Sequence, residues 1–343
     1  MPLSKIQTAD MLDTPNLGRR NLIINGSMQV AQRGTSSTSL SYQTVDRFAV
    51  DQTQLDNLTL TQAQVADAPA GTGLKKSFKF TTTAAETAVA SNEYLRVYHA
   101  VEGKDVQRFE WGTSTGKEVT VSFYVKSSIT GTFACSIYIF DANVIMNKPY
   151  TISSANTWER KTLTFPAYTA GGSAVPTDDT TAGIYLNFGL LAGSGYNTQI
   201  NDWTAYGGGT NLLGGQTANV GTVNGTTWQL TGVQLEVGSV ATDFEHLLFG
   251  EEIGLCQRYY QLSHANGQGY VNGNQHVGLR GTYRTEMRAA PTVTLTLNAS
   301  NQNNMSGSPS VHINTKHGYY GYITANSAGN YYFYYDSVSE AEL

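Results

Sequence analysis

The sequence predicts an all-β protein: a jelly-roll β-sandwich followed by a short connector helix and a smaller C-terminal β domain. Only 14% of its 343 residues are charged, whereas about a quarter is usual for soluble domains. Ser, Thr, Asn, Gln and 35 glycines replace the missing charges, and these residues suit exposed strand faces and tight turns. Apolar and polar residues also alternate along many short segments, which is the period of a half-buried strand.

Residues 1–20 are expected to form a separate N-terminal arm. This stretch has two prolines and a weak apolar pattern that includes Ile6, Met11 and Leu12. Two interpretations stay open: a flexible terminus, or an arm that docks on a neighbouring subunit. The arm is followed by an expected strand, Asn21–Val30, with a kink at Asn25 because Asn-Gly favours left-handed backbone geometry.

Residues 21–247 are expected to form the sandwich. Val119, Val121, Phe123 and Val125 alternate with polar or amphipathic residues, which predicts one buried strand face. The expected strands are Leu58–Gln64, Ser77–Thr82, Glu93–His99, Val119–Lys126, Phe133–Phe140, Glu159–Phe165, Gly183–Leu191 and Thr227–Val237. Long Gly-rich loops at 166–182 and 192–225 interrupt them, and loops of this length are often functional.

Residues 248–266 are expected to form the connector, with one short helix. Phe249, Ile253, Cys256 and Tyr260 recur at three- to four-residue spacing, so they line one face of that helix. We favour a helix that packs on its own domain, and a contact between subunits is the alternative. Cys256 and Cys135 are expected to be reduced, buried thiols.

Residues 267–343 are expected to form the small β domain, whose core would benefit from partners. Its expected strands are Gln275–Arg284, Pro291–Asn298, Val311–Asn314, Tyr319–Ala325 and Tyr331–Val338. The last of these places aromatic residues on both strand faces, and only one face can belong to the core. Candidate subunit-interface residues are therefore Tyr331, Phe333 and Tyr335, together with Phe249, Ile253 and Tyr260 of the connector.

Composition and motifs exclude several functions. The net charge of −5 argues against nucleic acid as a partner, since phosphate binding needs a basic field. We expect no membrane insertion and no signal peptide, hence a protein made in the cytoplasm. The histidines have no metal-ligand spacing, and no motif pairs two carboxylates for glycoside hydrolysis. We therefore expect that the protein is not an enzyme.

Six segments resemble bacteriophage tail-fibre and related virion proteins built on a carbohydrate-binding-module-like jelly roll. In chain order they are Leu17–Gly34, Val45–Phe48, Val233–Gly238, Phe244–His246, Leu255–Tyr260 and Met287–Thr292. The resemblance implies a virion component, most simply a tail fibre or receptor-binding adhesin that recognises host surface glycans. A head-fibre, capsid-decoration or tail-assembly protein is the alternative, and a glycan depolymerase is the third. It also implies a homotrimer, other virion proteins as partners and a bacterial surface polysaccharide as ligand.

Related modules often carry a structural calcium between their first and last strands, and Asn25 and Glu236 occupy comparable places here. Ser27 and Gln29 stand where an acidic cluster would be needed, and calcium prefers several carboxylate oxygens. We therefore expect no cofactor, and calcium remains the alternative.

Aromatic side chains in or beside polar loops are the candidate glycan-binding residues, because sugar rings stack on aromatic faces. They are Trp203, Tyr206, Tyr168, Tyr196 and Trp158. For Trp158, which precedes an expected strand, we favour capping of the sandwich core. For Trp203 and Tyr206, a ligand and a partner chain are equally compatible with the Gly-rich loop.

Overall fold

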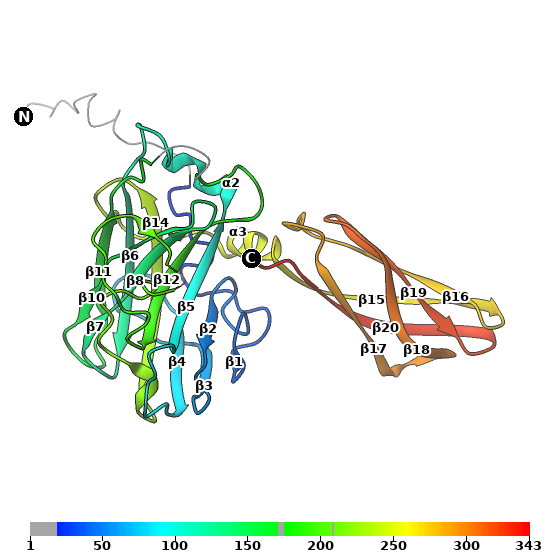
Figure 1. Cartoon of the computed structure of the whole chain (residues 1–343). Coiled ribbons are helices and arrows are strands. Elements are labelled where there is room, and N and C mark those ends of the chain that lie inside the picture. Colours follow the sequence, from blue (N-terminus) through cyan, green and yellow to red (C-terminus); the bar gives the residue numbers. More distant parts are fainter. Residues whose placement is uncertain (1–18, 171–174, 208) are drawn as a thin grey trace, which may run out of the picture.

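The computed structural model describes residues 19–170, 175–207 and 209–343. The predicted arm at 1–20 therefore lies outside the described residues, except for Arg19 and Arg20. The protein consists of a large β-sandwich and an elongated small β domain, with one helix between them (Figure 1). This architecture confirms the predicted all-β fold class. Among the described residues no helix is long and apolar enough to cross a membrane.

The sandwich is a jelly roll of two six-stranded antiparallel sheets. In sheet order, the first contains β1 (Ser36–Ser37), β3 (Thr59–Val65), β4 (Ser77–Ala84), β14 (Thr227–Val237), β6 (Val119–Ser127) and β11 (Glu159–Phe165). The second contains β13 (Thr204–Ala205), β9 (Val144–Asn147), β8 (Cys135–Ile139), β12 (Ala182–Ala192), β5 (Tyr94–Glu102) and β2 (Ala49–Thr53). Smaller elements are the β7 (Gly131–Phe133) and β10 (Tyr150–Ile152) pair, α2 (Gly103–Val106), η1 (Gln107–Phe109) and η2 (Val220–Thr222).

Apolar side chains from the two facing sheets form one continuous core. Val119, Val121, Phe123 and Val125 are all buried in it, as their alternation predicts. Phe188 of the second sheet lies 6.1 Å from Trp228 of the first, measured between ring centroids. Such interlocking side chains fix the two sheets face to face, so that each sheet also has one outward face.

The segment Asn21–Val30 is not a strand, which corrects the prediction. Asn25 and Met28 have left-handed backbone angles, φ of 61° and 59°. The Asn25 amide donates to the carbonyls of Val30 and Asp46, both at 2.9 Å, and accepts from the Val30 N–H. Asn tolerates this conformation because its side chain replaces the missing backbone partners.

This turn ties the start of the sandwich to its end. The Asn21 side chain donates to the Val233 carbonyl at 3.0 Å and accepts from the Leu235 N–H at 3.0 Å. Backbone N–H groups of Arg20 and Asn21 donate to the Glu245 carboxylate. Four of the segments that carry the family resemblance therefore meet here, because Asn25 also binds the Asp46 carbonyl of the Val45–Phe48 segment. The Asn25 N–H in addition donates to the Glu252 carboxylate of the connector at 2.5 Å.

The connector helix α3 (Phe249–Gln257) packs on the sandwich, which agrees with the favoured interpretation. Cys256 is buried in a cluster with Ile24, Val30 and Tyr259, and both cysteines are free and buried. Burial raises the pKa of the Cys256 thiol well above its ordinary value. The connector is shorter than predicted, since a strand begins at Tyr260.

The small domain stacks two three-stranded antiparallel sheets. One contains, in order, β15 (Tyr260–Asn272), β20 (Ala328–Glu340) and β17 (Thr292–Asn303), and the other β16 (His276–Thr282), β19 (Gly318–Ala325) and β18 (Met305–Asn314). Its core cluster includes Phe333, Tyr335, Leu279 and Ile323. The exposed aromatics of β20 are Tyr332 and Tyr334.

These positions correct three interface candidates. Phe333 and Tyr335 belong to the core and present no surface to another subunit. Tyr260 is buried beneath Arg33, whose guanidinium carbon lies 3.7 Å from the ring centroid. Tyr331 is half-buried against Phe333, Ile253 is also half-buried, and Phe249 is 55% exposed. Alternation along β20 gives the physical reason, because only every second residue faces out.

Buried ion pairs fix the small domain to the sandwich. The chain after β20 returns to the sandwich, where Glu342 pairs with Arg47 and, at 3.0 Å, with Arg33. Arg258 donates to both oxygens of Glu102, at 2.6 and 2.7 Å. The C-terminus thus lies beside α3 (Figure 1), and the junction is a packed interface rather than a free linker.

Candidate binding face on the second sandwich sheet

The outward face of the second sheet is lined with tyrosines. Strand pairing places Asp51 opposite Arg96, Asn187 opposite Tyr98, and Tyr185 opposite Tyr138. The neighbouring residues on the same strands, such as Leu95 and Leu186, point into the core. Five residues define this surface, which we call the tyrosine face: Tyr94, Arg96, Tyr98, Tyr138 and Tyr185.

Arg96 is held rigidly at the centre of the tyrosine face. Its Nε lies 2.8 Å and its Nη2 2.7 Å from Asp51 Oδ2, and its Nη1 donates to Asn187 Oδ1 at 2.8 Å. The Tyr94 hydroxyl donates to the same Asp51 oxygen at 2.9 Å. The guanidinium carbon also lies 4.9 Å from the Tyr98 ring centroid. One carboxylate thus neutralises the only cation, and the face is polar without net charge.

The rings form a continuous row across the strands. Tyr98 lies 5.6 Å from Tyr185 in an edge contact, and Tyr185 is stacked with Tyr138 at 6.1 Å and 23°. The ring of Tyr138 continues to Tyr206 at 4.6 Å. These rings are half-buried, and burial raises the pKa of Tyr98, Tyr138 and Tyr185. Their hydroxyls therefore stay protonated at neutral pH and can donate hydrogen bonds.

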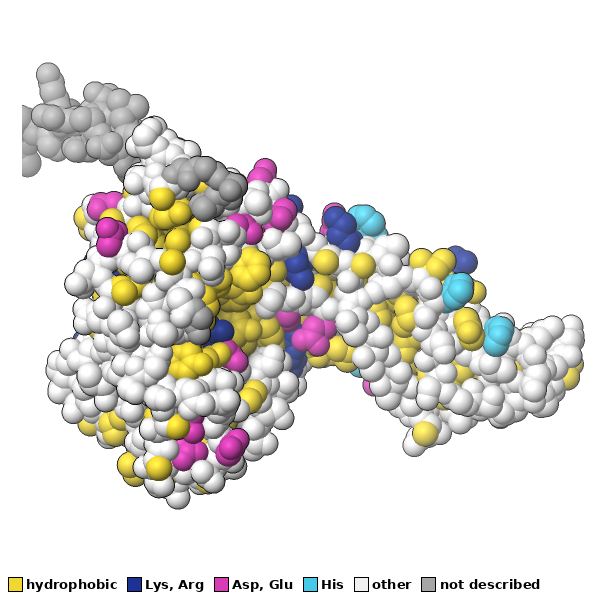
Figure 2. Space-filling view, in the orientation of Figure 1, with side chains coloured by type: hydrophobic (Ala, Val, Ile, Leu, Met, Phe, Trp, Pro, Cys, Tyr) yellow, Lys and Arg dark blue, Asp and Glu magenta, His cyan; other side chains and the backbone are white. Residues whose placement is uncertain are grey.

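Two segments border the face. On one side residues 193–207 and 209–218 fold over the sheet, with Leu212 and Leu213 buried and Tyr196 in edge contact with Tyr94 at 4.8 Å. On the other side Tyr42 lies 5.9 Å from Tyr98, and its hydroxyl donates to the Leu343 carbonyl at 3.2 Å. Figure 2 shows a hollow on the sandwich beside the small domain, floored by hydrophobic side chains with a basic and an acidic one nearby.

The predicted glycan-binding residues are only partly gathered here. Tyr196 and Tyr206 lie at the border of the tyrosine face, as described. Trp158 lies elsewhere: its Nε1 donates to Asp67 at 3.2 Å, and the Lys126 ammonium lies 5.0 Å from its ring centroid. Binding of a ligand by these three residues stays a prediction.

Trp203 and Tyr168 form part of the sandwich packing. Trp203 contacts Trp111 at 5.1 Å and Tyr168 at 5.7 Å, and its Nε1 donates to the Pro166 carbonyl. Tyr168 is only 5% exposed, which corrects its prediction as an exposed loop ring. The two Gly-rich loops that contain these residues were expected to be exposed, yet Tyr168 is buried and Trp203 is half-buried.

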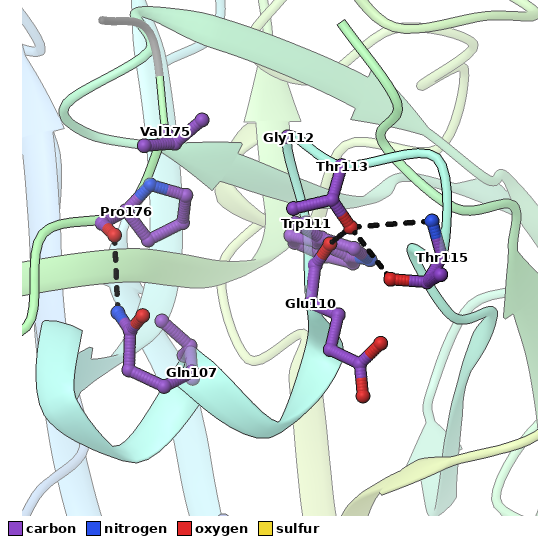
Figure 3. Close-up of a pocket in the computed structure, with 9 residues that line it drawn as sticks. Gln107, Glu110, Trp111, Gly112, Thr113, Thr115, Val175 and Pro176 are labelled. Carbon is purple, nitrogen blue, oxygen red and sulfur yellow. Dashed lines mark hydrogen bonds between the residues drawn. The ribbon is translucent and has the colours of Figure 1, made fainter. Parts of the chain in front are cut away.

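A second hollow of about 630 Å³ lies near this cluster. Val175 and Pro176 face the Glu110–Thr115 turn across it, with Trp111 at its base (Figure 3). Its single carboxylate, Glu110, pairs with Lys117 at 2.5 Å, and that hydrogen bond lowers the pKa of Glu110. Since Trp111 is almost fully buried, this hollow offers no ring face comparable to the tyrosine face.

The two calcium candidates are occupied by protein groups. Asn25 makes the turn contacts given above, and the Glu236 carboxylate accepts from the Thr242 N–H at 2.8 Å and from the Thr242 hydroxyl at 2.7 Å. Within the described parts of the chain, no group of three or more His, Cys, Asp or Glu side chains is placed to hold a metal ion.

The five residues of the tyrosine face were not singled out from sequence, although the signal was present. In β5 the sequence reads Tyr94, Arg96 and Tyr98 at every second position, between Leu95 and Val97. Alternation identifies both faces of a strand, and the face opposite the core is the one whose side chains are open to a ligand.

Comparison with known proteins gives only distant structural likeness. No family model matches the chain, and no curated protein matches it. A tailspike domain of bacteriophage CBA120 aligns with a TM-score of 0.33 and 13% identity. The alignment covers 64% of this chain and 21% of the tailspike chain. A sugar-binding protein described as putative, from Bacteroides thetaiotaomicron, aligns with a TM-score of 0.34 and 13% identity, covering 64% of this chain and 100% of that one. A family 11 carbohydrate-binding module from Clostridium thermocellum aligns with a TM-score of 0.31 and 9% identity, covering 61% and 98% respectively.

Proposed function

We propose that the tyrosine face binds glycan chains, and that the protein is a non-enzymatic bacteriophage virion component. The simplest form of this proposal is a tail fibre or receptor-binding adhesin that recognises host surface glycans. The observation that carries it is the row of half-buried tyrosine rings around a neutralised, immobilised Arg96.

The chemistry of this face suits a sugar chain. A pyranose has an apolar face of C–H groups, which packs on an aromatic ring, and hydroxyls, which need hydrogen-bond partners around it. Here the rings of Tyr98 and Tyr185 supply the apolar contact, and the hydroxyls of these two residues supply donors. The Arg96–Asp51–Asn187 network holds its groups in place before binding, so little conformational entropy remains to be lost.

The virion part of the proposal rests on the family resemblance of six segments. Four of them meet at one end of the sandwich through Asn21, Asn25 and Glu245. This supports one structural unit, which closes the sandwich and leads into the small domain.

Binding of the purified full chain to a panel of bacterial surface polysaccharides and β-glucans tests the proposal. Tyr98→Ala and Tyr185→Ala should each weaken binding of the best ligand by about tenfold, as expected for a central aromatic anchor. Tyr124→Ala is the matched control, because Tyr124 is half-buried on the other sheet. Equal losses in all three variants, or binding to no member of the panel, would contradict the proposal.

An assembly role is the second candidate, and exposed aromatics on the small domain favour it. Tyr270, Tyr332 and Tyr334 are 65%, 45% and 49% exposed. In that case they contact other subunits, in a homotrimer or on the virion, and Tyr332→Ser with Tyr334→Ser should lower the sedimentation coefficient. Loss of virion incorporation after deletion of residues 1–20 would support docking through the arm.

A glycan depolymerase is the third candidate. The carboxylate that contacts the tyrosine face is that of Asp51, which is engaged by Arg96 and Tyr94, whereas glycoside hydrolysis needs two carboxylates. Release of reducing ends from a bound polysaccharide would overturn the non-enzymatic assignment.

A further inference from the structure

The small domain carries a second face on which rings and basic groups alternate. In the β16–β19–β18 sheet, Arg280 lies opposite Tyr320, and Gly278 lies opposite Tyr322. The intervening residues, such as Leu279 and Ile323, are buried in the domain core. Five outward residues define what we call the histidine–tyrosine face: His276, Arg280, His312, Tyr320 and Tyr322.

These five side chains form one contiguous surface. The His276 ring lies 4.2 Å from Tyr322, and His312 lies 6.3 Å from Tyr322 and 6.5 Å from Tyr320. The Arg280 guanidinium carbon lies 5.7 Å from the Tyr320 ring centroid. His276, Arg280 and His312 are exposed, and the two tyrosines are half-buried between them. The two tyrosine rings thus form the half-buried centre of the surface, and the exposed basic side chains lie around them.

The charge of this region differs from that of the rest of the chain. Apart from Asp336 and Glu340 of β20 and Glu342 at the junction, the small domain has four basic residues, Arg280, Arg284, Arg288 and Lys316, and a single acidic residue, Glu286. That one carboxylate pairs with Lys316 at 3.1 Å. Across the described part of the chain, Arg280 makes no ion pair, and the strands β16, β18 and β19 contain no Asp or Glu. In a protein of net charge −5, this face is a local basic surface.

A hollow adjoins the face. It has a volume of about 370 Å³, and its lining includes Asn266, Gly278, Arg280, Tyr320 and Tyr335. Figure 2 shows histidine and Lys or Arg side chains along the side of the small domain that carries β16 and β19. Gly278 leaves room beside Tyr320, because a Cβ there would lie 3.2 Å from the ring. A ligand can therefore approach the ring and the guanidinium together.

We propose that the histidine–tyrosine face is a second binding site, for a glycan bearing carboxylate or phosphate groups. Arg280 binds the anionic group, His276 and His312 add donors, and Tyr320 and Tyr322 contact the sugar rings. Charge complementarity selects this ligand class, because a guanidinium without a counter-charge binds two oxygens of a carboxylate or a phosphate through paired hydrogen bonds. The tyrosine face lacks this property, since Asp51 neutralises Arg96.

Binding of the full chain to three soluble polysaccharides tests the site. The probes are alginate, which carries carboxylates, a phosphomannan, which carries phosphates, and pullulan, which is neutral. Wild-type protein should bind alginate or the phosphomannan, and binding should weaken as NaCl rises from 50 to 300 mM. Arg280→Gln should reduce that affinity by about tenfold, the scale of a hydrogen bond to a charged group. His276→Gln with His312→Gln should reduce it by a smaller factor.

Lys75→Gln is the matched control, because Lys75 is an exposed cation on the sandwich and its loss changes the net charge equally. The double variant Tyr98→Ala, Tyr185→Ala should keep its affinity for the acidic probes, which separates this site from the tyrosine face. Three results would overturn the proposal. They are no binding of either acidic probe, equal weakening of binding by Lys75→Gln, and an Arg280→Gln variant that changes the sedimentation coefficient without changing the affinity for the probes. The last would assign the face to contacts between copies of the chain.

Discussion

The two β domains use the same layered design with cores of very different size. Forty buried apolar residues form the continuous core of the sandwich, whereas the corresponding cluster of the small domain contains nine, both taken over the described residues. Small cores contribute little net stability, so such domains usually need additional support. In this chain the support comes from the junction, where Arg47, Glu342, Arg258 and Glu102 form buried ion pairs.

The two proposed binding faces also differ, in their net charge. Arg96 is neutralised by Asp51, and Arg280 lacks an ion pair among the described residues. One arrangement of rings around an arginine therefore gives a neutral face on the sandwich and a basic face on the small domain. If both faces bind glycans as proposed, the presence or absence of a single carboxylate determines which class of glycan each face suits.

The largest expected effect comes from opening the sandwich core. Phe188→Ala removes a fully buried ring and should lower the free energy of unfolding by about 3–5 kcal/mol. Phe333→Ala removes the corresponding ring of the small domain. Denaturant unfolding should be followed by tyrosine and by tryptophan fluorescence. The transition seen by tryptophan should shift to a lower denaturant concentration only for Phe188→Ala. Equal effects on both signals would mean that the two domains unfold as one unit.

The junction gives the next largest effect. Glu342→Gln leaves the fully buried Arg47 side chain without its counter-charge, which costs about 3 kcal/mol or more in comparable sites. Hydrogen exchange should then accelerate in β15 and β20 while the sandwich core stays protected. Glu340→Gln is the control, because Glu340 pairs with Arg33 at a more exposed position. If this control accelerated hydrogen exchange in β15 and β20 as much as Glu342→Gln does, the buried Arg47–Glu342 pair would not be what stabilises the junction.

The stability of the two domains should also differ in its dependence on pH. Burial and the nearby Arg47 hold the pKa of His99 well below its ordinary value, whereas the small domain's four histidines are exposed. The unfolded state takes up the proton more readily than the folded state, so stability falls as pH drops below about 6.5. Between pH 6.5 and 5.5 the sandwich should lose about 1 kcal/mol, measured by urea unfolding. Persistence of this slope in His99→Gln would contradict the assignment to His99.

The smallest expected effect concerns ligand class. Asp51→Asn removes the carboxylate that neutralises Arg96 and should make the tyrosine face attractive to acidic glycans. In an Arg280→Gln background, affinity for alginate should rise by about threefold, the scale of one partly exposed charge. Unchanged or weaker alginate binding would show that the carboxylate does not set the preference.

Periodicity predicted the regular strands but not the irregular ones. The segment Asn21–Val30 looked like a strand because its apolar residues dominate the pattern, whereas Asn25 turns the chain through side-chain hydrogen bonds. Strand β15 was not among the predicted strands, because residues 248–266 are expected to form the connector and the next expected strand begins at Gln275. It contains Gly267 and Gly269. Those glycines are needed there, since a Cβ on Gly267 would meet the Phe333 ring at 2.5 Å.

The site was harder to predict than the fold, for a related physical reason. Tertiary packing decides which loop aromatics are exposed. Tyr168 looked available although it is buried, and Trp203 is half-buried because it packs against Trp111 and Tyr168. The outward tyrosines of β5, β8 and β12 come from strands far apart in sequence, and only their pairing brings them into one row.

Hydrogen exchange of the full chain with and without its best polysaccharide ligand tests the central claim most directly. Binding at the tyrosine face should slow exchange in β5, β8 and β12 and in the bordering segment 193–207, where the backbone lies beneath or beside the ligand. Protection confined to the Gln107–Thr115 turn around the hollow of Figure 3, with β5 and β12 unchanged, would contradict it.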